Sequence, residues 1–589
     1  MRSSFLVAFL LPIAVLAQRT GLPHALAPEE VGRILDYRNS RSDIERGITA
    51  PPSFPVRTMA EWEEVQILAI TWAGYPTILK QIVRYALDEV PVIIVCDNAT
   101  DVETYLQGSA GGGPITDLSN VTYMVEPFNS VWMRDYGMET MYRNEVDTLL
   151  LMDWIYNRPR PEDDVLPDAI ATYLNIPIYS SSQAPNDLVH TGGNFMADGF
   201  GTAFSSMLVD DENGANGDYN QTVRTSQGVN DMMEQWMGIP QGRYIKMETL
   251  PYDGIHHIDM HMKLLDEETL LVGEFPTGES DGPAIEANIA DIQANYTSVF
   301  GTPYEIIRIP MPPSTGGSFP PNASYRTYAN NIFINKTVLV PTYREQYDTT
   351  GLRILREALP GYRVIGIDSD NSPDNIISAS GALHCITKCI GVADPLLIRH
   401  QQLRDTYETV IPYTVTGYIR HRSGIADADL FWSTDTTQAY ASLPMTDIGN
   451  NEWSAAIPAQ PVGTEVFYYI HATANSGKQQ MRPIVAPDGY WNFHVLDVGS
   501  GVAENNGPAL GDPFPMPATN WICIPVGARQ GLVEVNIVDA LGRSVMTVHS
   551  GRAPSSGRLY ADVSRLDAGS YFIVAEGNGQ RSVKPMVKD

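Results

Sequence analysis

Residues 54–390 repeat one local pattern, in which a short apolar strand, a stretch with helical spacing and a second strand follow one another. An apolar run over Val65–Trp72 precedes helical spacing over Tyr75–Leu87, and a second apolar run follows over Val90–Cys96. Strand–helix–strand units of this kind predict α/β layers. Further short apolar runs predict strands at 123–125, 148–152, 202–206, 270–273, 332–334 and 338–340, with helices over 285–297 and 350–359. We therefore predict an α/β domain over residues 46–393.

Polar clusters stand beside these predicted strands at a nearly regular spacing. They recur every 55 to 73 residues between positions 135 and 385, as Arg134–Asp135, Gly192–Asn194, His257–Asp259, Tyr328–Asn330 and His384–Cys385. Such a period favours a cyclic arrangement in which each unit contributes one group to a shared centre. The units share no internal sequence identity, so the spacing alone supports this expectation.

The chain of 589 residues is too long for one hydrophobic core. After residue 393, period-two strands separated by turns predict an all-β sandwich over 394–498. A linker rich in Gly, Pro, Ala and Asn over 499–518 precedes a small β domain over 519–589.

The start of the chain predicts export. Residues 1–17 combine Arg2, an apolar stretch over Phe5–Ile13 and small residues before Gln18, the pattern of a secretory signal peptide. Residues 18–45 show no sustained periodicity and are typical of a leader or propeptide. No later apolar run approaches the roughly 18 residues that span a bilayer, so we expect no transmembrane segment.

The charge and the cysteine content limit which ligands and which stabilising groups the chain is expected to have. The net charge of −30, from 69 acidic against 39 basic residues, disfavours nucleic acid and anionic membranes and mildly favours cationic substrates. Four cysteines are too few for a disulfide framework in an exported chain of this size. Cys385 and Cys389, with one adjacent histidine, form a poor zinc signature, so no metal site is predicted.

The polar clusters contain the residue types that chemistry on a guanidinium requires. This delocalised cation is a poor electrophile, so an enzyme that attacks its carbon needs a soft nucleophile, carboxylates that clamp its N–H groups, and an acid for the departing ammonia. Cys385, Asp135, Asp259 and His257 are of these types. His257 and Asp259 are two residues apart, so on a strand both would face the same side.

Other interpretations stay open for each of these residues alone. A cysteine is often a small buried hydrophobe, and His-x-Asp is often a solvated strand face. Asp135 beside Arg134 is also compatible with a weak surface ion pair.

Five motifs occur in the order and context of the guanidine-modifying enzymes and most resemble the branch with agmatine deiminases and bacterial peptidylarginine deiminases. They are Trp132–Gly137, Gly192–Asn194 with Asp198–Gly199, His257–Asp259, Tyr328–Asn330 with Asn335, and Gly381–Thr387. The resemblance covers roughly residues 46–393. It implies a five-bladed α/β propeller, hydrolysis of a guanidinium through a covalent thiouronium intermediate, and no metal or organic cofactor.

The resemblance also implies roles for individual residues. Cys385 would be the nucleophile, His257 the general acid and then base, and Asp135 and Asp259 the guanidinium clamps. Asn330 would support them as a polar group, and the substrate-binding residues would include Trp132, Gly193 and Asn194.

Departures from the agmatine deiminase pattern bear on the substrate. After Asp153–Asn157 those enzymes typically continue with Trp-Gly-Gly, whereas this chain has Arg158-Pro159-Arg160. Two arginines suit a substrate carboxylate, which agmatine lacks. Thr191 replaces a Glu that usually helps to bind a cationic substrate, and Met138 replaces a Pro. We therefore expect peptides ending in arginine as substrates, with citrulline and ammonia as products. The alternative for the two arginines is a solvated loop, paired with Glu162, Asp163 and Asp164.

The end of the chain has a resemblance of its own. Asn536–Arg543 and Asp562–Tyr571 resemble a type IX secretion sorting domain of Bacteroidetes. This implies the type IX machinery as a partner and a secreted or outer-membrane surface-attached protein. Residues 394–498 resemble the immunoglobulin-like domain found between catalytic and sorting domains in such exports. Adhesive β modules are the alternative for both parts.

Three rival functions remain, and a fourth is disfavoured. The first is a deiminase for agmatine or free arginine, the second an enzyme that transfers the amidino group to an amine, and the third an inactive surface-binding protein. A papain-like protease is disfavoured because His257 precedes Cys385, whereas that family places its cysteine first.

Overall fold

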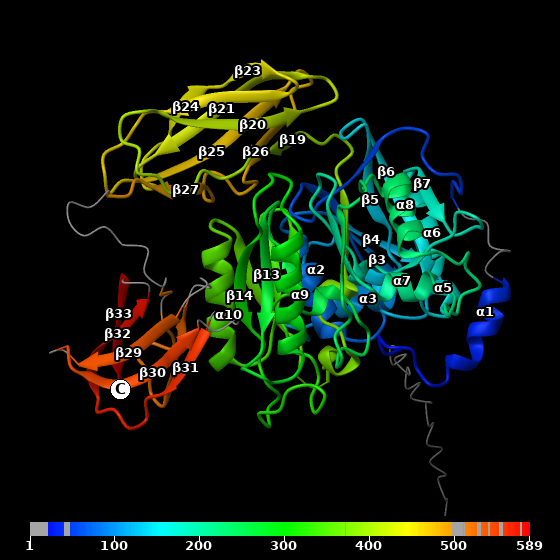
Figure 1. The fold of residues 1–589 in the computed structure, drawn as a ribbon. Coiled ribbons are helices and arrows are strands. Elements are labelled where there is room, and N and C mark those ends of the chain that lie inside the picture. Colours follow the sequence, from blue (N-terminus) through cyan, green and yellow to red (C-terminus); the bar gives the residue numbers. More distant parts are fainter. Residues whose placement is uncertain are drawn as a thin grey trace, which may run out of the picture. The chain divides into compact units, whose positions relative to one another are not determined.

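The computed structural model describes residues 22–40, 47–371, 373–497, 510–511, 513–526, 532–539, 542–552, 558–577 and 580–589. The predicted signal peptide, residues 1–17, lies outside them, as does most of the predicted linker. The chain divides into two compact units, Met1–Val495 and Leu496–Asp589. Figure 1 labels the helices and strands of both units.

Described residues between 47 and 391 form five sheets (Figure 1). In spatial order, the first contains β18 (Lys388–Gly391), β2 (Val65–Thr71), β3 (Val92–Cys96) and β4 (Val121–Val125). The second contains β1 (Val56–Thr58), β5 (Glu139–Arg143), β6 (Thr148–Tyr156) and β7 (Ile178–Ser181), with β8 (Val189–His190) paired to β6. The other three are β11 (Tyr244–Met247), β10 (Ala203–Ser206) and β9 (Met196–Ala197); β12 (Met262–Leu264), β13 (Thr269–Glu274) and β14 (Glu305–Pro310); and β15 (Ile332–Ile334), β16 (Thr337–Thr342) and β17 (Arg363–Asp368).

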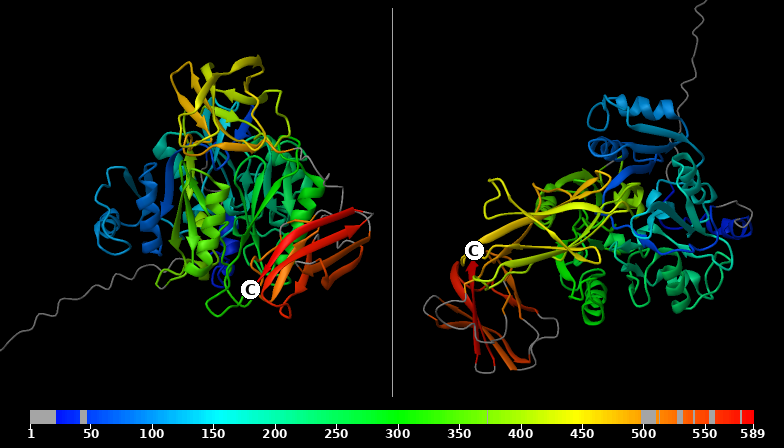
Figure 2. Two further views of the ribbon diagram at one scale, coloured as in Figure 1. Left: turned by 90° about the vertical axis from the view of Figure 1, so that its left-hand side faces the viewer. Right: turned by 90° about the horizontal axis from the view of Figure 1, so that it is seen from above.

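The helices connect strands within these sheets, with one exception. They are α2 (Pro76–Ala86), α3 (Ala99–Gln107), α4 (Met133–Tyr136), α5 (Pro161–Asp164), α6 (Leu166–Leu174), α7 (Leu208–Asn213), α8 (Ser226–Met237), α9 (Gly282–Asn295) and α10 (Glu345–Ala358). The exception is α4, which lies between β4 of the first sheet and β5 of the second. The right-hand view in Figure 2 places the blue, cyan and green parts of this region on different sides. The predicted mixed α/β region is confirmed.

One pairing pattern recurs in all five sheets. A central strand pairs antiparallel with one neighbour and, after a helical connection, parallel with the other, as β13 does with β12 and β14. The same holds for β6, β10 and β16. In the remaining sheet β2 pairs parallel with β3, but its antiparallel partner β18 comes from the far end of the region. The two ends of the region therefore join in one sheet.

Residues 31–40, in the stretch without sustained periodicity, form the 3-10 turn η1 (Val31–Arg33) and the helix α1 (Ile34–Ser40). Tyr37 is buried against Ile155, Val189 and Tyr219. Its hydroxyl donates to a carboxylate oxygen of Asp164 at 2.7 Å. The N-terminal segment, defined as residues 22–40, therefore packs on the α/β region.

Residues 397–494 form two sheets around one core. One sheet has the order β19 (Leu397–Arg399), β20 (Tyr413–Arg420), β24 (Glu452–Ile457), β23 (Thr446–Gly449). The other has the order β22 (Ala441–Pro444), β21 (Ile425–Ser433), β25 (Glu465–Ala474), β26 (Gln479–Arg482), with β27 (Trp491–His494) paired to β25. Alternate residues of β20 are buried, as expected for a strand that covers a core on one face. Ion pairs such as Arg482–Glu267, at 3.0 Å, join this part to the α/β region.

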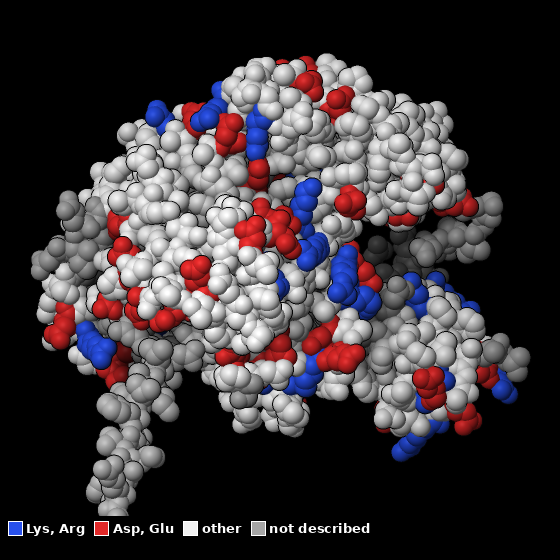
Figure 3. Space-filling view, turned by 180° about the vertical axis from the view of Figure 1, so that it is seen from behind, with Lys and Arg blue, Asp and Glu red and all other residues white. Residues whose placement is uncertain are grey.

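The second unit is also all-β, as predicted. It contains β28 (Trp521–Pro525) paired with β31 (Arg558–Asp562), and a sheet of β30 (Ser544–Arg552), β29 (Leu532–Asp539), β32 (Gly569–Gly577) and β33 (Gln580–Lys588). Across the described residues of both units, no helix is long and apolar enough to cross a membrane. On the face drawn in Figure 3, described acidic and basic side chains are interspersed among uncharged ones.

Candidate active site

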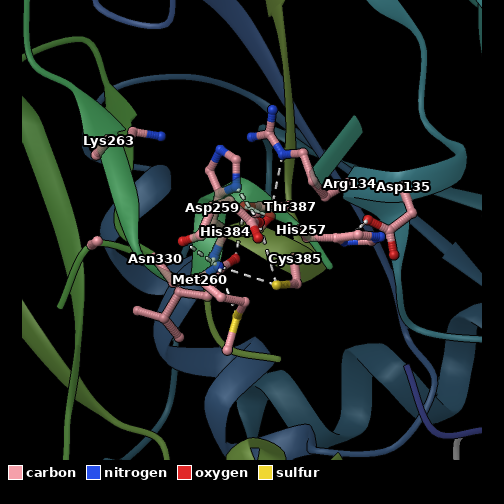
Figure 4. A network of polar contacts seen from close by, with 12 residues as sticks. Arg134, Asp135, His257, Asp259, Met260, Lys263, Asn330, His384, Cys385 and Thr387 are labelled. Atoms are coloured by element: carbon pink, nitrogen blue, oxygen red, sulfur yellow. Dashed lines mark hydrogen bonds and ion pairs between the residues drawn. The ribbon is translucent and has the colours of Figure 1, made fainter. Parts of the chain in front are cut away.

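Cys385 lies in the 3-10 turn η6 (His384–Ile386), which Thr387 separates from β18. Its side chain is fully buried. The Asn330 amide donates to its Sγ at 3.1 Å, and an oxygen of Asp259 lies 3.4 Å from the same sulfur (Figure 4). The turn η6 therefore places the thiol of Cys385 between the amide of Asn330 and the carboxylate of Asp259.

His257 and Asp259 do not lie on one strand, so that expectation was wrong. Residues 258–260 form the 3-10 helix η4, with His257 at its N-cap. A strand would need an extended backbone at Ile258, whereas the 3-10 helix gives Ile258 a helical backbone and so brings His257 and Asp259 closer together along the chain. The two side chains nevertheless meet near Gly193, so the predicted proximity is present for a different local reason.

Gly193 is the point where three predicted site residues converge. A Cβ at this position would lie 2.6 Å from His257 Nδ1, 2.8 Å from Asp135 Oδ1 and 3.3 Å from Asp259 Oδ2. Only glycine leaves these side chains room to approach the backbone of η3 (Gly192–Asn194). The neighbouring Asn194 is buried, and its side-chain oxygen accepts the amide N–H of Ser206 at 2.8 Å.

His384 belongs to the site, although its position beside Cys385 predicted no role for it. Its Nδ1 lies 2.8 Å from Asp259 Oδ2, and its Nε2 lies 2.7 Å from Glu61 Oε1. Lys263 and Arg134 also contact Glu61, with Arg134 at 3.3 Å. His384, Glu61, Lys263 and Arg134 therefore form an ionic network that holds the carboxylate of Asp259 next to the thiol. Glu61 lies far from the other motifs in sequence and carries no local signal.

Burial sets opposite protonation tendencies for the thiol and the acids. Burial and then the charges of Asp259 and Asp135 raise the pKa of the Cys385 thiol well above its usual range. Burial alone would raise the pKa of Asp135, but the contact with His24 and the charge of Arg158 outweigh it and hold this pKa below its ordinary value. Burial likewise opposes ionisation of Asp259, yet its hydrogen bond with His384 leaves its pKa lowered. The structure thus favours two carboxylates beside a protonated thiol.

His257 is uncharged in this environment. Burial lowers its pKa to about 3, against the opposing charge of Asp135. Its Nδ1 lies 3.5 Å from Asp135 Oδ1, and neither ring nitrogen has a hydrogen-bond partner among the described residues. Asp135 Oδ1 and Asp259 Oδ1 are also buried without such a partner. The two carboxylate oxygens are unused acceptors, which match the N–H donors of a cationic ligand.

Arg158 and Arg160 are buried, so the alternative of a solvated loop paired with nearby acids is wrong. Arg158 Nε donates to the carbonyl of His24 at 3.1 Å. Arg160 pairs with Glu30 through two bonds of 2.7 and 2.9 Å and donates to the carbonyl of Pro23 at 2.7 Å. Both arginines thus bind oxygens of the N-terminal segment.

Asp135 and Arg134 are buried and have different partners, so the surface ion-pair alternative is also wrong. Asp135 contacts His24, whose ring stacks on Trp132 with centroids 4.2 Å apart. Among the described residues, His24, Asp135 and His257 form the one group of at least three possible metal ligands. His24 and Asp135 touch directly, which leaves no space for an ion between them.

The thiol, the two carboxylates and the histidine of this site are the residue types that chemistry on a guanidino group requires. Residues 53–390, more than half of the chain, match the family model described as Porphyromonas-type peptidyl-arginine deiminase. The chain therefore belongs to that family.

Individual relatives are distant. A Vibrio parahaemolyticus protein named as an agmatine deiminase is 23% identical over 297 residues, which are 46% of this chain and 78% of that protein. A crystal structure from Porphyromonas gingivalis, assigned as an arginine deiminase, is 21% identical with a TM-score of 0.49 and covers 57% of this chain and 98% of its own. The structure of C. jejuni agmatine deiminase is 19% identical with a TM-score of 0.47, covering 58% of this chain and 97% of its own.

Residues 513–589 match the family model of the secretion system C-terminal sorting domain. This domain marks proteins that the type IX system of Bacteroidetes exports. The predicted localisation, secreted or attached to the outer-membrane surface, is confirmed.

Proposed function

We propose that this protein hydrolyses the guanidinium of peptidyl-arginine, preferably at a peptide's carboxy terminus, to citrulline and ammonia. The family membership limits the chemistry to guanidino groups but does not choose between a peptide and agmatine. The choice rests on how the buried arginines are placed relative to the carboxylates.

The contacts of His24 carry this proposal. Its ring contacts Asp135, while its own main-chain carbonyl accepts a hydrogen bond from Arg158 at 3.1 Å. One residue therefore spans the distance from the carboxylate to the arginine. A carboxy-terminal arginine would reach both in the same way, with its guanidinium on the carboxylates and its terminal carboxylate on Arg158. Agmatine has no group for that arginine.

The fold that we propose for residues 46–393 is a five-bladed α/β propeller. Support comes from the pairing pattern shared by five sheets and from the joining of β18 to β2, which would close a ring. The predicted catalytic groups lie in short helices, turns or loops that precede strands, as Asp135 in α4 and Cys385 in η6 do. For residues 394–498 we propose an immunoglobulin-like sandwich, because their two sheets enclose one core.

In the proposed first step, Asp135 and Asp259 bind the guanidinium through paired hydrogen bonds and neutralise its charge. The bound cation relieves the repulsion that raises the thiol pKa, and neutral His257 accepts the thiol proton. The thiolate of Cys385 forms a bond to the guanidinium carbon. The bond to one terminal nitrogen breaks, and His257 returns the proton so that ammonia departs. An S-linked thiouronium remains.

In the second step, His257 removes a proton from water, and the resulting hydroxide attacks the same carbon. The carbon–sulfur bond breaks, the thiolate regains a proton from His257, and the new hydroxyl group on the carbon loses its proton to solvent, so that neutral citrulline is released. That proton balances the ammonia released in the first step, which becomes ammonium. Asn330 donates to the sulfur at 3.1 Å and would stabilise the thiolate in both steps.

A comparison of three substrates tests the proposal. A peptide ending in free arginine, the same peptide as its amide, and agmatine would be assayed for citrulline or carbamoylputrescine and for ammonia. A lost charge-assisted hydrogen bond corresponds to roughly a 10- to 100-fold change, so we expect kcat/KM to fall by that factor from the acid to the amide. Preference for agmatine would refute the substrate class.

Two controls distinguish the remaining rival functions. Because the N-terminal segment contacts Arg158 and Arg160, the wild-type chain would be assayed both intact and after cleavage between residues 40 and 47. The variant Cys385→Ala would be assayed alongside it. Absence of product from both wild-type forms would favour the inactive surface-binding protein. Undiminished activity of Cys385→Ala would refute the nucleophile. Ammonia released in equal amount to citrulline argues against transfer of the amidino group to an amine.

A further inference from the structure

The N-terminal segment occupies the proposed substrate site. His24 is fully buried, stacked on Trp132 with an angle of 7° between the rings. Its ring also meets His257 edge-on, with centroids 4.9 Å apart. Three predicted site residues, Trp132, Asp135 and His257, therefore surround the side chain of His24, a residue that belongs to none of the catalytic motifs.

His24 also resembles a guanidinium in its hydrogen bonding. Its Nδ1 lies 2.8 Å from the carbonyl oxygen of Ser380, and its Nε2 contacts a carboxylate oxygen of Asp135. Both partners are acceptors, so the ring meets them by donating from both nitrogens. A planar group that donates N–H bonds to a carboxylate and stacks on an indole has the recognition features of an arginine head group.

A second set of contacts holds the main chain on either side of His24. Trp132 Nε1 donates to the carbonyl of Leu22 at 2.9 Å, and His24 N donates to the carbonyl of Ala379 at 3.1 Å. Six residues further on, Glu30 presents its carboxylate to Arg160 through two bonds, and both side chains are only 1% exposed. A buried, bidentate pair of this kind is strong and geometrically specific.

Two independent features thus match the substrate that we propose. His24 provides a planar donor at the carboxylate, and Glu30 provides a carboxylate at an arginine. A substrate arginine could not bind while His24 is in place, since His24 holds both partners that the substrate needs: Asp135 through its ring and Arg158 through its main-chain carbonyl. Tyr37, buried in its own small cluster, anchors the segment further along.

We infer that the face formed by Trp132, Asp135, Arg158 and Arg160 is a docking surface for the chain's own residues 22–40, and that this contact keeps the uncleaved protein inactive. The inference rests on the proposed function insofar as the blocked site is the substrate site. Release of the segment, by cleavage between residues 40 and 47, opens the site. An exported enzyme of this design acquires activity only when a protease has acted on it.

Variants of the full-length chain test the docking contacts without any cleavage. His24→Ala removes the ring from the carboxylate, and Glu30→Gln removes one charge of the buried pair. Each shifts the balance between closed and open site, so we expect citrulline formation to rise roughly tenfold over the intact wild type. Glu29→Gln is the matched control, because Glu29 is the exposed neighbour of Glu30. Equal activity of wild type, His24→Ala and Glu30→Gln would overturn the inference.

Cleavage provides the second test. A recognition sequence for a site-specific protease would replace residues 41–46, and the cut protein would be separated from the released peptide. We expect activity to rise after separation and to fall again when a synthetic peptide of residues 22–40 is added, but not with the same peptide carrying His24→Ala. Full activity before cleavage, or no inhibition by the wild-type peptide, would refute the contact.

Alkylation of Cys385 makes the two proposals separable. Iodoacetamide labelling, followed by peptide mass spectrometry, reports access to the thiol whether or not any substrate is turned over. Faster labelling of Cys385 in His24→Ala and in the cut protein, with no citrulline from any form, would support the docking contact and refute the deiminase activity. Unchanged labelling together with unchanged activity would refute the docking contact alone.

Discussion

Nδ1 of His384 lies 2.8 Å from Oδ2 of Asp259, and this contact joins the residue next to the proposed nucleophile to a proposed guanidinium clamp. The other ring nitrogen lies 2.7 Å from Glu61. Because both partners are carboxylates, the ring is held from two sides and fixes the orientation of Asp259. His384 is thus a positioning residue: the proposed substrate contacts are made by Asp259.

Replacing His384 with Gln should therefore lower kcat more than it raises KM. The amide can satisfy only part of the two contacts, so Asp259 loses its fixed orientation, and small displacements of a positioning group cost roughly 100-fold in rate. Steady-state kinetics with an arginine peptide would measure this. His494→Gln, at a half-exposed position in the β sandwich, is the control. Unchanged kcat in His384→Gln would show that Asp259 does not depend on this contact.

Gly193→Ala should abolish activity while the protein stays folded. The added methyl group would lie within 3 Å of His257 Nδ1 and Asp135 Oδ1, closer than carbon atoms approach such groups. We expect kcat/KM to fall by about 100-fold or more, since the reacting geometry is displaced. Gly254→Ala is the matched control, because a Cβ there meets nothing within 4 Å. Circular dichroism would confirm the fold, and full activity of Gly193→Ala would contradict the site geometry.

Asn330→Asp should make the thiol of Cys385 harder to ionise than Asn330→Ala does. The alanine variant removes the N–H donor at 3.1 Å from the sulfur, whereas the aspartate variant also adds a negative charge beside it. Each unit of added thiol pKa lowers the thiolate fraction about tenfold. Rates of iodoacetamide labelling at pH 7, in protein freed of the N-terminal segment, should fall in the order wild type, Asn330→Ala, Asn330→Asp. A faster rate in either variant would argue against a donor role for Asn330.

The pH dependence of labelling should show the raised thiol pKa directly. Burial, Asp259 and Asp135 all disfavour the thiolate, so the pKa lies above its usual range and the thiolate fraction grows with rising pH. In the substrate-free protein without the N-terminal segment, we expect the labelling rate of Cys385 to rise about tenfold per pH unit from pH 7 to 9 without levelling off. A plateau below pH 8 would mean that the free enzyme already holds a thiolate.

The catalytic motifs could be predicted because the reactive side chains of each motif lie within a few consecutive residues. His257, Asp259 and Cys385 fall in such runs, and the strands around them alternate with helices clearly enough to indicate an α/β region. The backbone at Ile258 could not be predicted, since a two-residue spacing fits both a strand and a 3-10 turn.

Contacts between distant parts of the chain had no sequence signal. His24 reaches Asp135 over 111 residues, and Glu61 reaches His384 over 323. Neither His24 nor Glu61 stands in a motif, and tertiary packing alone determines their partners. The same holds for Arg160, whose short motif predicted a substrate carboxylate, or nearby acids of the same loop, but not Glu30 as its partner.

The strand that follows Cys385 has a consequence for the timing of activity. β18 pairs with β2, so the thiol is attached to a strand whose partner lies more than 300 residues earlier in the chain. Contacts of such long sequence separation form late, after shorter loops have closed. A nascent chain, or one only partly threaded through a membrane, lacks this strand and therefore has no assembled site. The order of synthesis thus delays assembly of the site until the residues of β18 have been made.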